Sequence, residues 1–153
     1  MAYKVIEGGS ITSPKGFLAG ACYVGVKSRK SEKPDVAILY SQEPASCAAL
    51  FTTNKFCAAP VLLGREVLKK GRARAVVINS GNANAATGEQ GMENAKKVEL
   101  LAEELLGLGE DEVFVSSTGV IGQQLPVEKV LDGVRRIVPN MTVEQGTDAA
   151  WAI

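Results

Sequence analysis

Residues 73–79 read ARAVVIN and residues 112–118 read EVFVSST, and the stretch between them has the spacing of an amphipathic helix. Each run is short, apolar and rich in β-branched residues, and each is bounded by Gly, Asn or Ser, which is the pattern of a strand. Between the runs, apolar residues recur at intervals of three and four, which predicts a helix over 88–106. Strand, helix and strand in this order predict two parallel strands joined by a right-handed crossover.

Each end of the predicted helix over 88–106 carries a boundary signal. Thr87 and Gln90 resemble a capping box before the first turn, and Gly107 suits the left-handed residue that ends a helix. The face expected to be buried is the one that carries Val98, Leu101, Ala102 and Leu105.

A second amphipathic stretch completes a β-α-β-α unit. It is predicted to begin near Pro126, which suits a first helical turn, and to end before Pro139. The apolar face of this helix over 126–138 would bury Val127, Val130, Leu131, Val134 and Ile137. Shorter helices are predicted over 64–70 and from about Thr147 onward.

Further apolar runs precede this unit and cover residues 17–26, 35–41 and 47–53. The connections between them are too short for crossover helices, so these runs are expected to be antiparallel neighbours. The predicted fold class is therefore α/β, with a mixed sheet that combines antiparallel N-terminal strands with the β-α-β-α unit. Because no repeat or linker divides the chain, residues 1–153 are expected to form a single domain.

The composition and charge exclude several classes of protein. Hydrophobic residues make up 46% of the chain and charged residues 22%, which is typical of a folded soluble domain. The 17 basic and 17 acidic residues cancel, so no net field attracts nucleic acid. No segment approaches the roughly 20 apolar residues of a membrane helix, and the N-terminus lacks the apolar core of a signal peptide. We therefore expect a cytoplasmic protein that binds neither nucleic acid nor a membrane.

The choice of catalytic side chains is limited because the sequence contains no histidine. The chain cannot build a Ser-His-Asp or Cys-His arrangement, and it lacks the commonest metal ligand. An N-terminal threonine that uses its own α-amino group as the base needs no histidine, although it requires a cut chain. Cys22, Cys47 and Cys57 lack the number and spacing of a disulfide framework or a zinc site, so we interpret them as small core residues and expect no metal.

Two polar segments follow the paired strands, at the edge of the sheet where open α/β folds usually bind their ligands. The first, NSGNANAATG at 79–88, contains no phosphate-binding motif, and its asparagines serve a turn as readily as a ligand. The second, SSTG at 116–119, is either an ordinary polar loop between a strand and a helix or an anion site built from hydroxyls and backbone N–H groups. Thr52, Thr53 and Asn54 are interpreted as the polar end of a strand, with a binding role as the alternative.

Taken together, the motifs of this chain resemble the ornithine acetyltransferases. These are the bifunctional glutamate N-acetyltransferase/amino-acid acetyltransferases of the arginine pathway. The resemblance runs nearly end to end. It is carried, in this order, by PKGF at 14–17, LFTTNKFCAAPV at 50–61, VINSGNAN at 77–84 and SSTGVIG at 116–122.

The resemblance implies an enzyme that cleaves itself. The precursor is cut before a threonine in an Ala-Thr-Met-Leu-like segment, and the new N-terminal threonine takes acetyl from N-acetylornithine and passes it to glutamate. No cofactor is implied, and acetyl-CoA stays open as an alternative acetyl donor. The family's Thr-Gly pair, here Thr118 and Gly119, is implied to form the oxyanion hole. A glycine permits close approach of the backbone, and a threonine adds a hydroxyl donor.

This sequence departs from the family pattern because its 153 residues contain no Ala-Thr-Met-Leu-like segment. The resemblance therefore implies that the nucleophile lies in a downstream beta chain, that this alpha-chain part forms a hetero-oligomer with it, and that this part alone is inactive. We expect the family pattern to continue past Ile153, and either a truncation or a second proteolytic cut would explain that end. The alternative interpretation is a non-catalytic binding or assembly domain that has kept the scaffold.

Overall fold

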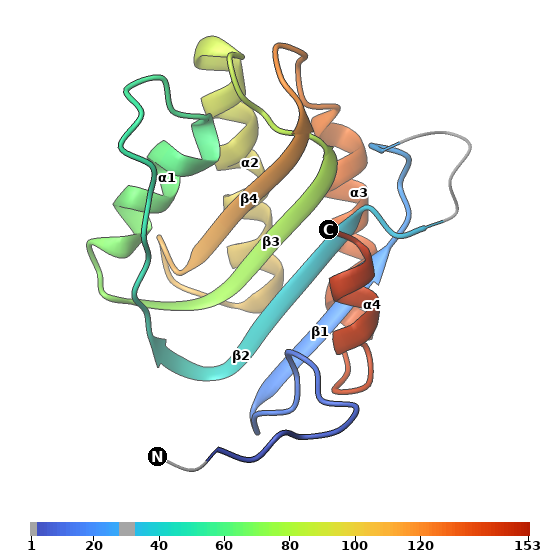
Figure 1. The fold of residues 1–153 in the computed structure, drawn as a ribbon. Helices are drawn as coiled ribbons and strands as arrows, with labels where there is room; N and C mark the ends of the chain where they lie inside the picture. The colour runs from blue at the N-terminus through green and yellow to red at the C-terminus, as the bar shows by residue number, and fades with distance from the viewer. Residues whose placement is uncertain (1–2, 28–32) are drawn as a thin grey trace.

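The computed structural model describes residues 3–27 and 33–153, which are organised around a mixed four-stranded sheet (Figure 1). The strands lie across the sheet in the order β1 (Phe17–Cys22), β2 (Val36–Ser46), β3 (Arg72–Asn82) and β4 (Val113–Val120). The pairs β1–β2 and β2–β3 are antiparallel, whereas β3 and β4 are parallel. The predicted α/β class, with antiparallel N-terminal strands and a parallel β-α-β connection, is confirmed.

The helices lie on both faces of this sheet. They are α1 (Ala59–Leu68), α2 (Gly88–Leu106), α3 (Val127–Ile137), the short 3-10 helix η1 (Val138–Asn140) and α4 (Gly146–Trp151). α1, α2 and α3 cover one face, and α4 lies against β1 and β2 on the opposite face (Figure 1). On that opposite face, Val76, Ile78 and Phe114 of β3 and β4 are only partly buried by the described residues. We call this part of the sheet the open face.

Two hydrophobic cores follow from the alternation of side chains along β2. Val36 and Ile38 point toward α1, α2 and α3, whereas Ala37 between them points toward α4. The larger core joins the first two to side chains that include Val77, Val98, Val115, Val130 and Val134. The smaller core consists of alanines, whose short side chains let α4 lie close to the sheet: Ala19, Ala37, Ala149 and Ala152.

The boundaries of α2 are those that the sequence predicted. The helix runs from Gly88 to Leu106, and Gly107 follows in the left-handed conformation with a φ of 64°. Thr87 is the N-cap residue, but its hydroxyl makes no capping hydrogen bond. The hydroxyl donates instead to Asn84 Oδ1, at 2.9 Å. The predicted capping box is therefore wrong, because the loop before the helix uses the threonine side chain.

The buried face of α2 is rotated relative to the predicted one. Leu105 is 41% exposed, and Glu99 and Glu103 are buried. Glu99 forms an ion pair with Lys96, with 2.5 Å between Oε2 and Nζ, and Glu103 Oε1 accepts a hydrogen bond from the N–H of Glu112 at 3.2 Å. The ion pair offsets only part of the cost of burying Glu99, because its Oε1 has no partner among the described residues, and the spacing of apolar residues revealed neither burial.

The strand predicted over residues 47–53 does not form. β1 and β3 already occupy both edges of β2, so the run after Ser46 finds no place beside it. The N–H of Cys47 still donates to the carbonyl of Gly71 at 3.0 Å, and the chain then leaves the sheet toward α1. The third antiparallel strand is β3 instead, and β1 ends at Cys22 rather than at residue 26.

The other helices lie near their predicted positions. α3 follows Pro126 and ends before Pro139, and α4 contains Thr147. α1 begins earlier than the predicted residue 64 because Pro60 occupies its first turn, where a proline needs no hydrogen-bond partner for its nitrogen.

The cysteines are free and half-buried, and Cys22 packs against the larger core, where burial raises the pKa of its thiol. Within residues 3–27 and 33–153, His, Cys, Asp and Glu side chains nowhere gather in a group that could hold a metal ion. The same described residues contain no helix with the length and apolarity needed to cross a membrane.

Candidate functional site

The carboxyl ends of β3 and β4 lie side by side, as their parallel pairing requires. Ser80 pairs with Thr118, and Gly81 pairs with Gly119. The two predicted polar segments therefore meet at one edge of the sheet. Residues 116–119 are not a loop, however, because β4 continues through Val120 and the hydroxyl-rich segment is part of the strand.

The glycines of this pair are required by the packing of the two strands. Gly81 has a φ of 101° and Gly119 a φ of 136°, both in a region that side chains disfavour. A Cβ on Gly119 would lie 2.3 Å from the carbonyl carbon of Gly81 and 2.5 Å from the nitrogen of Asn82. The absent side chain at 119 thus permits close approach of β3, whereas the sequence suggested close approach of a substrate.

The hydrogen-bond phase of the ladder decides which N–H groups of β4 face outward. The carbonyls of Glu112 and Val120 both accept hydrogen bonds from the β3 side, from Ala75 and Ala83 among others. Alternate residues of a strand face the same neighbour, so the even-numbered residues of β4 pair with β3. β4 is the last strand of the described sheet, and the N–H of Gly119 consequently points toward its outer edge.

Thr118 contributes a different kind of donor. Its side chain is exposed on the open face of the sheet, while its backbone N–H belongs to the set that faces β3. The hydroxyl of Thr118 and the N–H of Gly119 are therefore adjacent donors, one from a side chain and one from the backbone. An oxygen within reach of both donors would have its negative charge stabilised by them.

The asparagines of the segment 79–88 are used within the protein. Asn79 accepts a hydrogen bond from the hydroxyl of Ser117 at 2.6 Å and donates to the carbonyl of Asn82 at 2.9 Å. Asn84 is also buried, and it donates to the carbonyl of Gly91 at 2.8 Å. Residues 79–82 belong to β3 rather than to a loop, and the hydrogen bonds of these amides support a structural role for the segment.

Asn82 links the segment 79–88 to the segment after β4. Its Nδ2 donates to the carbonyls of Gln123 and Gln124, at 3.1 and 3.3 Å, and its Oδ1 accepts the N–H of Asn84 at 2.8 Å. The N–H of Gly122 donates to the carbonyl of Ala85 at 2.9 Å. The pairing of the two strands thus continues beyond the sheet, and it fixes the segment that carries the adjacent donors.

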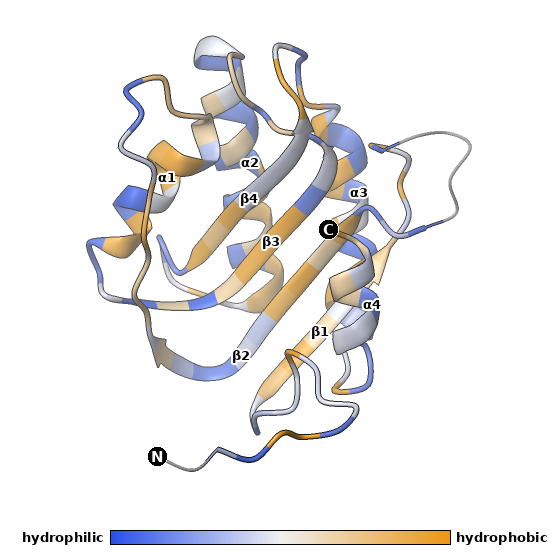
Figure 2. Ribbon diagram, in the orientation of Figure 1, coloured by the Kyte–Doolittle hydropathy of each residue, from blue (hydrophilic) through white to orange (hydrophobic). Residues whose placement is uncertain are grey.

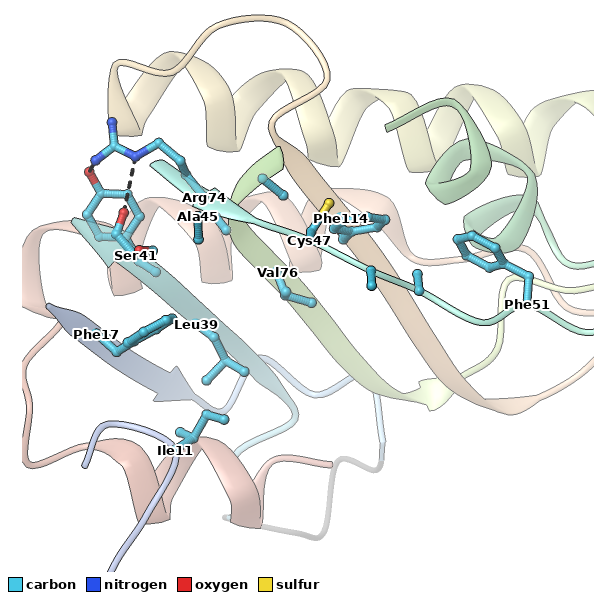
Figure 3. Close-up of a pocket in the computed structure, with 15 residues that line it drawn as sticks. Ile11, Phe17, Leu39, Ser41, Ala45, Cys47, Phe51, Arg74, Val76 and Phe114 are labelled. Atoms are coloured by element: carbon cyan, nitrogen blue, oxygen red, sulfur yellow. Dashed lines mark hydrogen bonds between the residues drawn. The ribbon is translucent and has the colours of Figure 1, made fainter. Parts of the chain in front are cut away.

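A small hollow of about 370 Å³ does not lie at these donors but farther along the open face, where it is almost entirely apolar (Figure 3). Figure 3 shows Ile11 and Phe17 at one end and Phe51 at the other, with Val76 between them. Figure 2 shows that much of β2 and β3 is hydrophobic, and Leu39 and Val76 of these strands line the hollow. We call this apolar hollow the open-face cavity.

Residues 52–54 lie outside both features. Thr52 Oγ1 accepts the N–H of Asn54 at 3.2 Å, and Asn54 Oδ1 accepts the N–H of Phe56 at 2.9 Å. All of them are exposed, and besides these local bonds the carbonyl of Thr52 accepts a hydrogen bond from the guanidinium of Arg65 at 2.8 Å. The structure does not bring them together with Thr118.

Sequence reasoning missed two contacts in this region. The hydroxyl of Ser80, which pairs with Thr118, donates to the carbonyl of Ala152 at 2.5 Å and so ties the end of β3 to the end of α4. The carboxylate of Asp35 is completely buried and accepts backbone hydrogen bonds from the segment that follows β1. An acidic residue directly before an apolar run was the only hint of this second contact.

Comparison with known sequences gives a consistent set of relatives. The ArgJ family model matches residues 18–153. The chain is 50% identical over 145 residues to the arginine biosynthesis bifunctional protein ArgJ of Caldanaerobacter subterraneus, and 49% identical over 144 residues to that of Lactococcus lactis. These matches cover 95% and 94% of this chain but 35% of each relative, so the chain spans about a third of their length.

Comparison with solved structures points to the same family as the comparison of sequences. The fold is similar to the crystal structure of the arginine biosynthesis bifunctional protein argJ from Bacillus halodurans, with a TM-score of 0.87 and 38% identity over 97% of this chain and 76% of that chain. It is also similar to the ornithine acetyltransferase of Mycobacterium tuberculosis solved with ornithine, with a TM-score of 0.89 and 38% identity over 97% of this chain and 80% of that one. The chain belongs to the ArgJ family.

Proposed function

We propose that this chain is the N-terminal part of an acetyltransferase that moves acetyl from N-acetylornithine to glutamate, and that it supplies the oxyanion hole. The observation that carries the proposal is the adjacent pair of donors, the exposed hydroxyl of Thr118 and the edge-facing N–H of Gly119. Membership of the ArgJ family supports the reaction, and the relative solved with ornithine supports the class of substrate.

The chemistry needs two donors at one oxygen. A threonine hydroxyl attacks the acetyl carbonyl carbon, and the carbonyl oxygen becomes an oxyanion that the hydroxyl of Thr118 and the N–H of Gly119 would stabilise. The C–N bond to ornithine then breaks, and the amine leaves with the proton taken from the nucleophile, which the α-amino group of that threonine relays. Attack by the glutamate amine on the acetyl-threonine ester repeats the sequence in reverse. The acetyl group needs no cofactor in this scheme.

The nucleophile belongs to a downstream chain in this proposal. We assign it to a beta chain whose N-terminal threonine is freed by self-cleavage. The curated relatives extend far beyond the region matched here, since the matches cover 35% of their length. That additional chain is the natural occupant of the open-face cavity, because apolar surface of this kind is stabilised only when another element covers it.

The proposal is tested with Thr118→Ala in the full-length enzyme, with Ser116→Ala as a matched control. Ser116 lies on the same face of β4 and is also exposed, but the donor pair does not include it. Thr118→Ala should lower kcat for acetyl transfer by about 10²–10³, the usual effect of removing one oxyanion donor, while Ser116→Ala retains kcat. Full activity of a folded Thr118→Ala enzyme would contradict the role of the hydroxyl.

A second experiment distinguishes this proposal from the assembly-domain alternative. Purified residues 1–153 should transfer no acetyl from N-acetylornithine to glutamate, and mass spectrometry of the native protein should detect a second chain that begins with threonine. Adding acetyl-CoA in place of N-acetylornithine tests the other donor. A stable complex with a partner chain but no turnover with either donor would favour the non-catalytic alternative.

A further inference from the structure

We infer that Asp35 is a positioning residue for the oxyanion segment, and that its carboxylate holds the backbone layer against which Gly81 and Gly119 are packed. This inference rests on the proposed function, because it concerns how the donors at Thr118 and Gly119 are kept in place. The hydrogen bonds that the Asp35 carboxylate accepts come from Val24, Val26 and Lys27, so its action on the donors is indirect.

The side chain of Asp35 is completely buried, and both of its oxygens accept hydrogen bonds. Oδ1 accepts the N–H of Val24 at 2.8 Å, and Oδ2 accepts the N–H groups of Val26 and Lys27 at 2.6 and 3.0 Å. Its carbonyl accepts the N–H of Ser80 at 2.9 Å. One residue therefore joins the segment after β1 to the carboxyl end of β3.

The segment held by this carboxylate lies directly on β3. A Cβ on Gly81 would lie 2.4 Å from the Cα of Lys27 and 2.8 Å from the carbonyl carbon of Val26. On its other side, Gly81 is in contact with Gly119, where a Cβ would lie 2.3 Å from the Gly81 carbonyl carbon. The three backbone segments are thus stacked without side chains between them, and a shift in the first is passed to the third.

A carboxylate suits the role of Asp35, which is to accept hydrogen bonds from three backbone N–H groups. It offers acceptor sites on both oxygens and has no hydrogen to donate. Asparagine has nearly the same shape, but it must point an NH₂ group either at the N–H of Val24 or at the two N–H groups of Val26 and Lys27. Asp35→Asn therefore loosens the segment without leaving a cavity.

The matched control is Glu103→Gln. Glu103 is also a buried carboxylate that holds a backbone N–H, that of Glu112, but it does so at the opposite end of β4. Asp35→Asn is expected to lower the melting temperature of the full-length enzyme, whereas Glu103→Gln should change it little, because its amide oxygen can still accept the N–H of Glu112. Only Asp35→Asn should disturb the end of the strand that carries the donors.

The experiment measures kcat and KM of the full-length variants, below their melting temperatures, together with amide hydrogen exchange. Asp35→Asn should lower kcat for transfer from N-acetylornithine to glutamate by about tenfold, with KM within about twofold, and exchange at Gly81 and Thr118, whose N–H groups face the β3–β4 ladder, should become faster. Glu103→Gln should leave kcat and this exchange unchanged. Combining Asp35→Asn with Thr118→Ala should lower kcat by less than the product of the single effects, because both act on one oxyanion contact.

The outcomes separate this inference from the proposed function. If Thr118→Ala lowers kcat but folded Asp35→Asn does not, or if Glu103→Gln lowers kcat equally, the positioning role is wrong and the oxyanion hole stands. If Thr118→Ala retains full activity, the proposed function fails first. Should Asp35→Asn not fold, Gly81→Ala disturbs the same contact from β3 and leaves the carboxylate intact, and normal kcat in that variant would overturn the inference.

Discussion

Gly119 is in direct backbone contact with Gly81 across the parallel strands β4 and β3, where a Cβ on Gly119 would lie 2.3 Å from the carbonyl carbon of Gly81. The contact places the edge-facing N–H of Gly119 at a fixed distance from the rest of the sheet. The sequence singled out Gly119 for its expected role in the oxyanion hole. The structure shows that packing against β3 already requires a glycine there. Close packing against β3 and access of a substrate to the N–H are compatible requirements, because the absence of a side chain at Gly119 satisfies both.

Gly119→Ala should destabilise the protein more than Gly122→Ala does. Both positions have a positive φ, of 136° and 79°, but nothing lies within 4 Å of a Cβ on Gly122. The alanine at 122 should cost about 1 kcal/mol from backbone strain alone. The alanine at 119 adds an overlap with β3 and should cost about 2–4 kcal/mol. Urea unfolding of the full-length variants measures the difference, and equal losses would mean that β4 moves away freely.

Asn82→Asp should destabilise the turn that supports the site. The side chain of Asn82 donates to the carbonyls of Gln123 and Gln124, and a carboxylate would direct negative charge at both oxygens. The expected loss is about 2–4 kcal/mol in the free energy of unfolding, because Asn82 is buried. Asn140→Asp is the control, since Asn140 is exposed and donates only to the carbonyl of Arg136. Similar urea midpoints for the two variants would show that the buried amide is dispensable.

Glu99 should make the stability of the protein depend on pH. Burial raises the pKa of this carboxyl above its ordinary value of 4.5, against the opposing effect of Lys96. The folded protein therefore holds the proton more tightly than the unfolded chain does. Its contribution to stability is fully present below pH 4.5 and is lost as the pH rises through the folded pKa.

Glu99→Gln should remove this dependence. Above the folded pKa the variant should be more stable than the parent by about 1.4 kcal/mol for each unit by which the pKa was raised. Glu103, whose pKa burial also raises, should leave part of the slope. Urea unfolding from about pH 4 to about pH 8 tests this, with the exposed Glu104→Gln as control. Parallel pH curves for parent and Glu99→Gln would exclude the effect.

Val76→Lys should weaken association with the downstream chain. Val76 lines the open-face cavity, and a lysine there places a charge in surface that the partner would cover. Leu100→Lys is the control, because Leu100 is 48% exposed on α2 and does not line that cavity. Co-expression followed by co-purification should show reduced recovery of the downstream chain with Val76→Lys only. Equal recovery with both variants would indicate that the partner binds elsewhere.

Much of the candidate site could be anticipated from its position after two apolar runs. Parallel pairing of 73–79 and 112–118 placed the two polar segments at one edge, and the structure has them there. Which residue offers a backbone N–H and which offers a side-chain hydroxyl could not be anticipated. Whether Thr118 or Gly119 turns its N–H outward depends on the phase of the ladder, and the phase is set by contacts between strands far apart in the chain.

By itself, the sequence determined the boundaries of α2 and the parallel connection around it, because helix periodicity and the glycine at 107 are local signals. Only the tertiary structure decided that residues 47–53 leave the sheet and that Glu99 is buried while Leu105 is exposed. An apolar run forms a strand only if an edge is free to pair with it, and a charged residue is buried only if a partner reaches it. Both conditions depend on residues distant in the chain, which no local pattern contains.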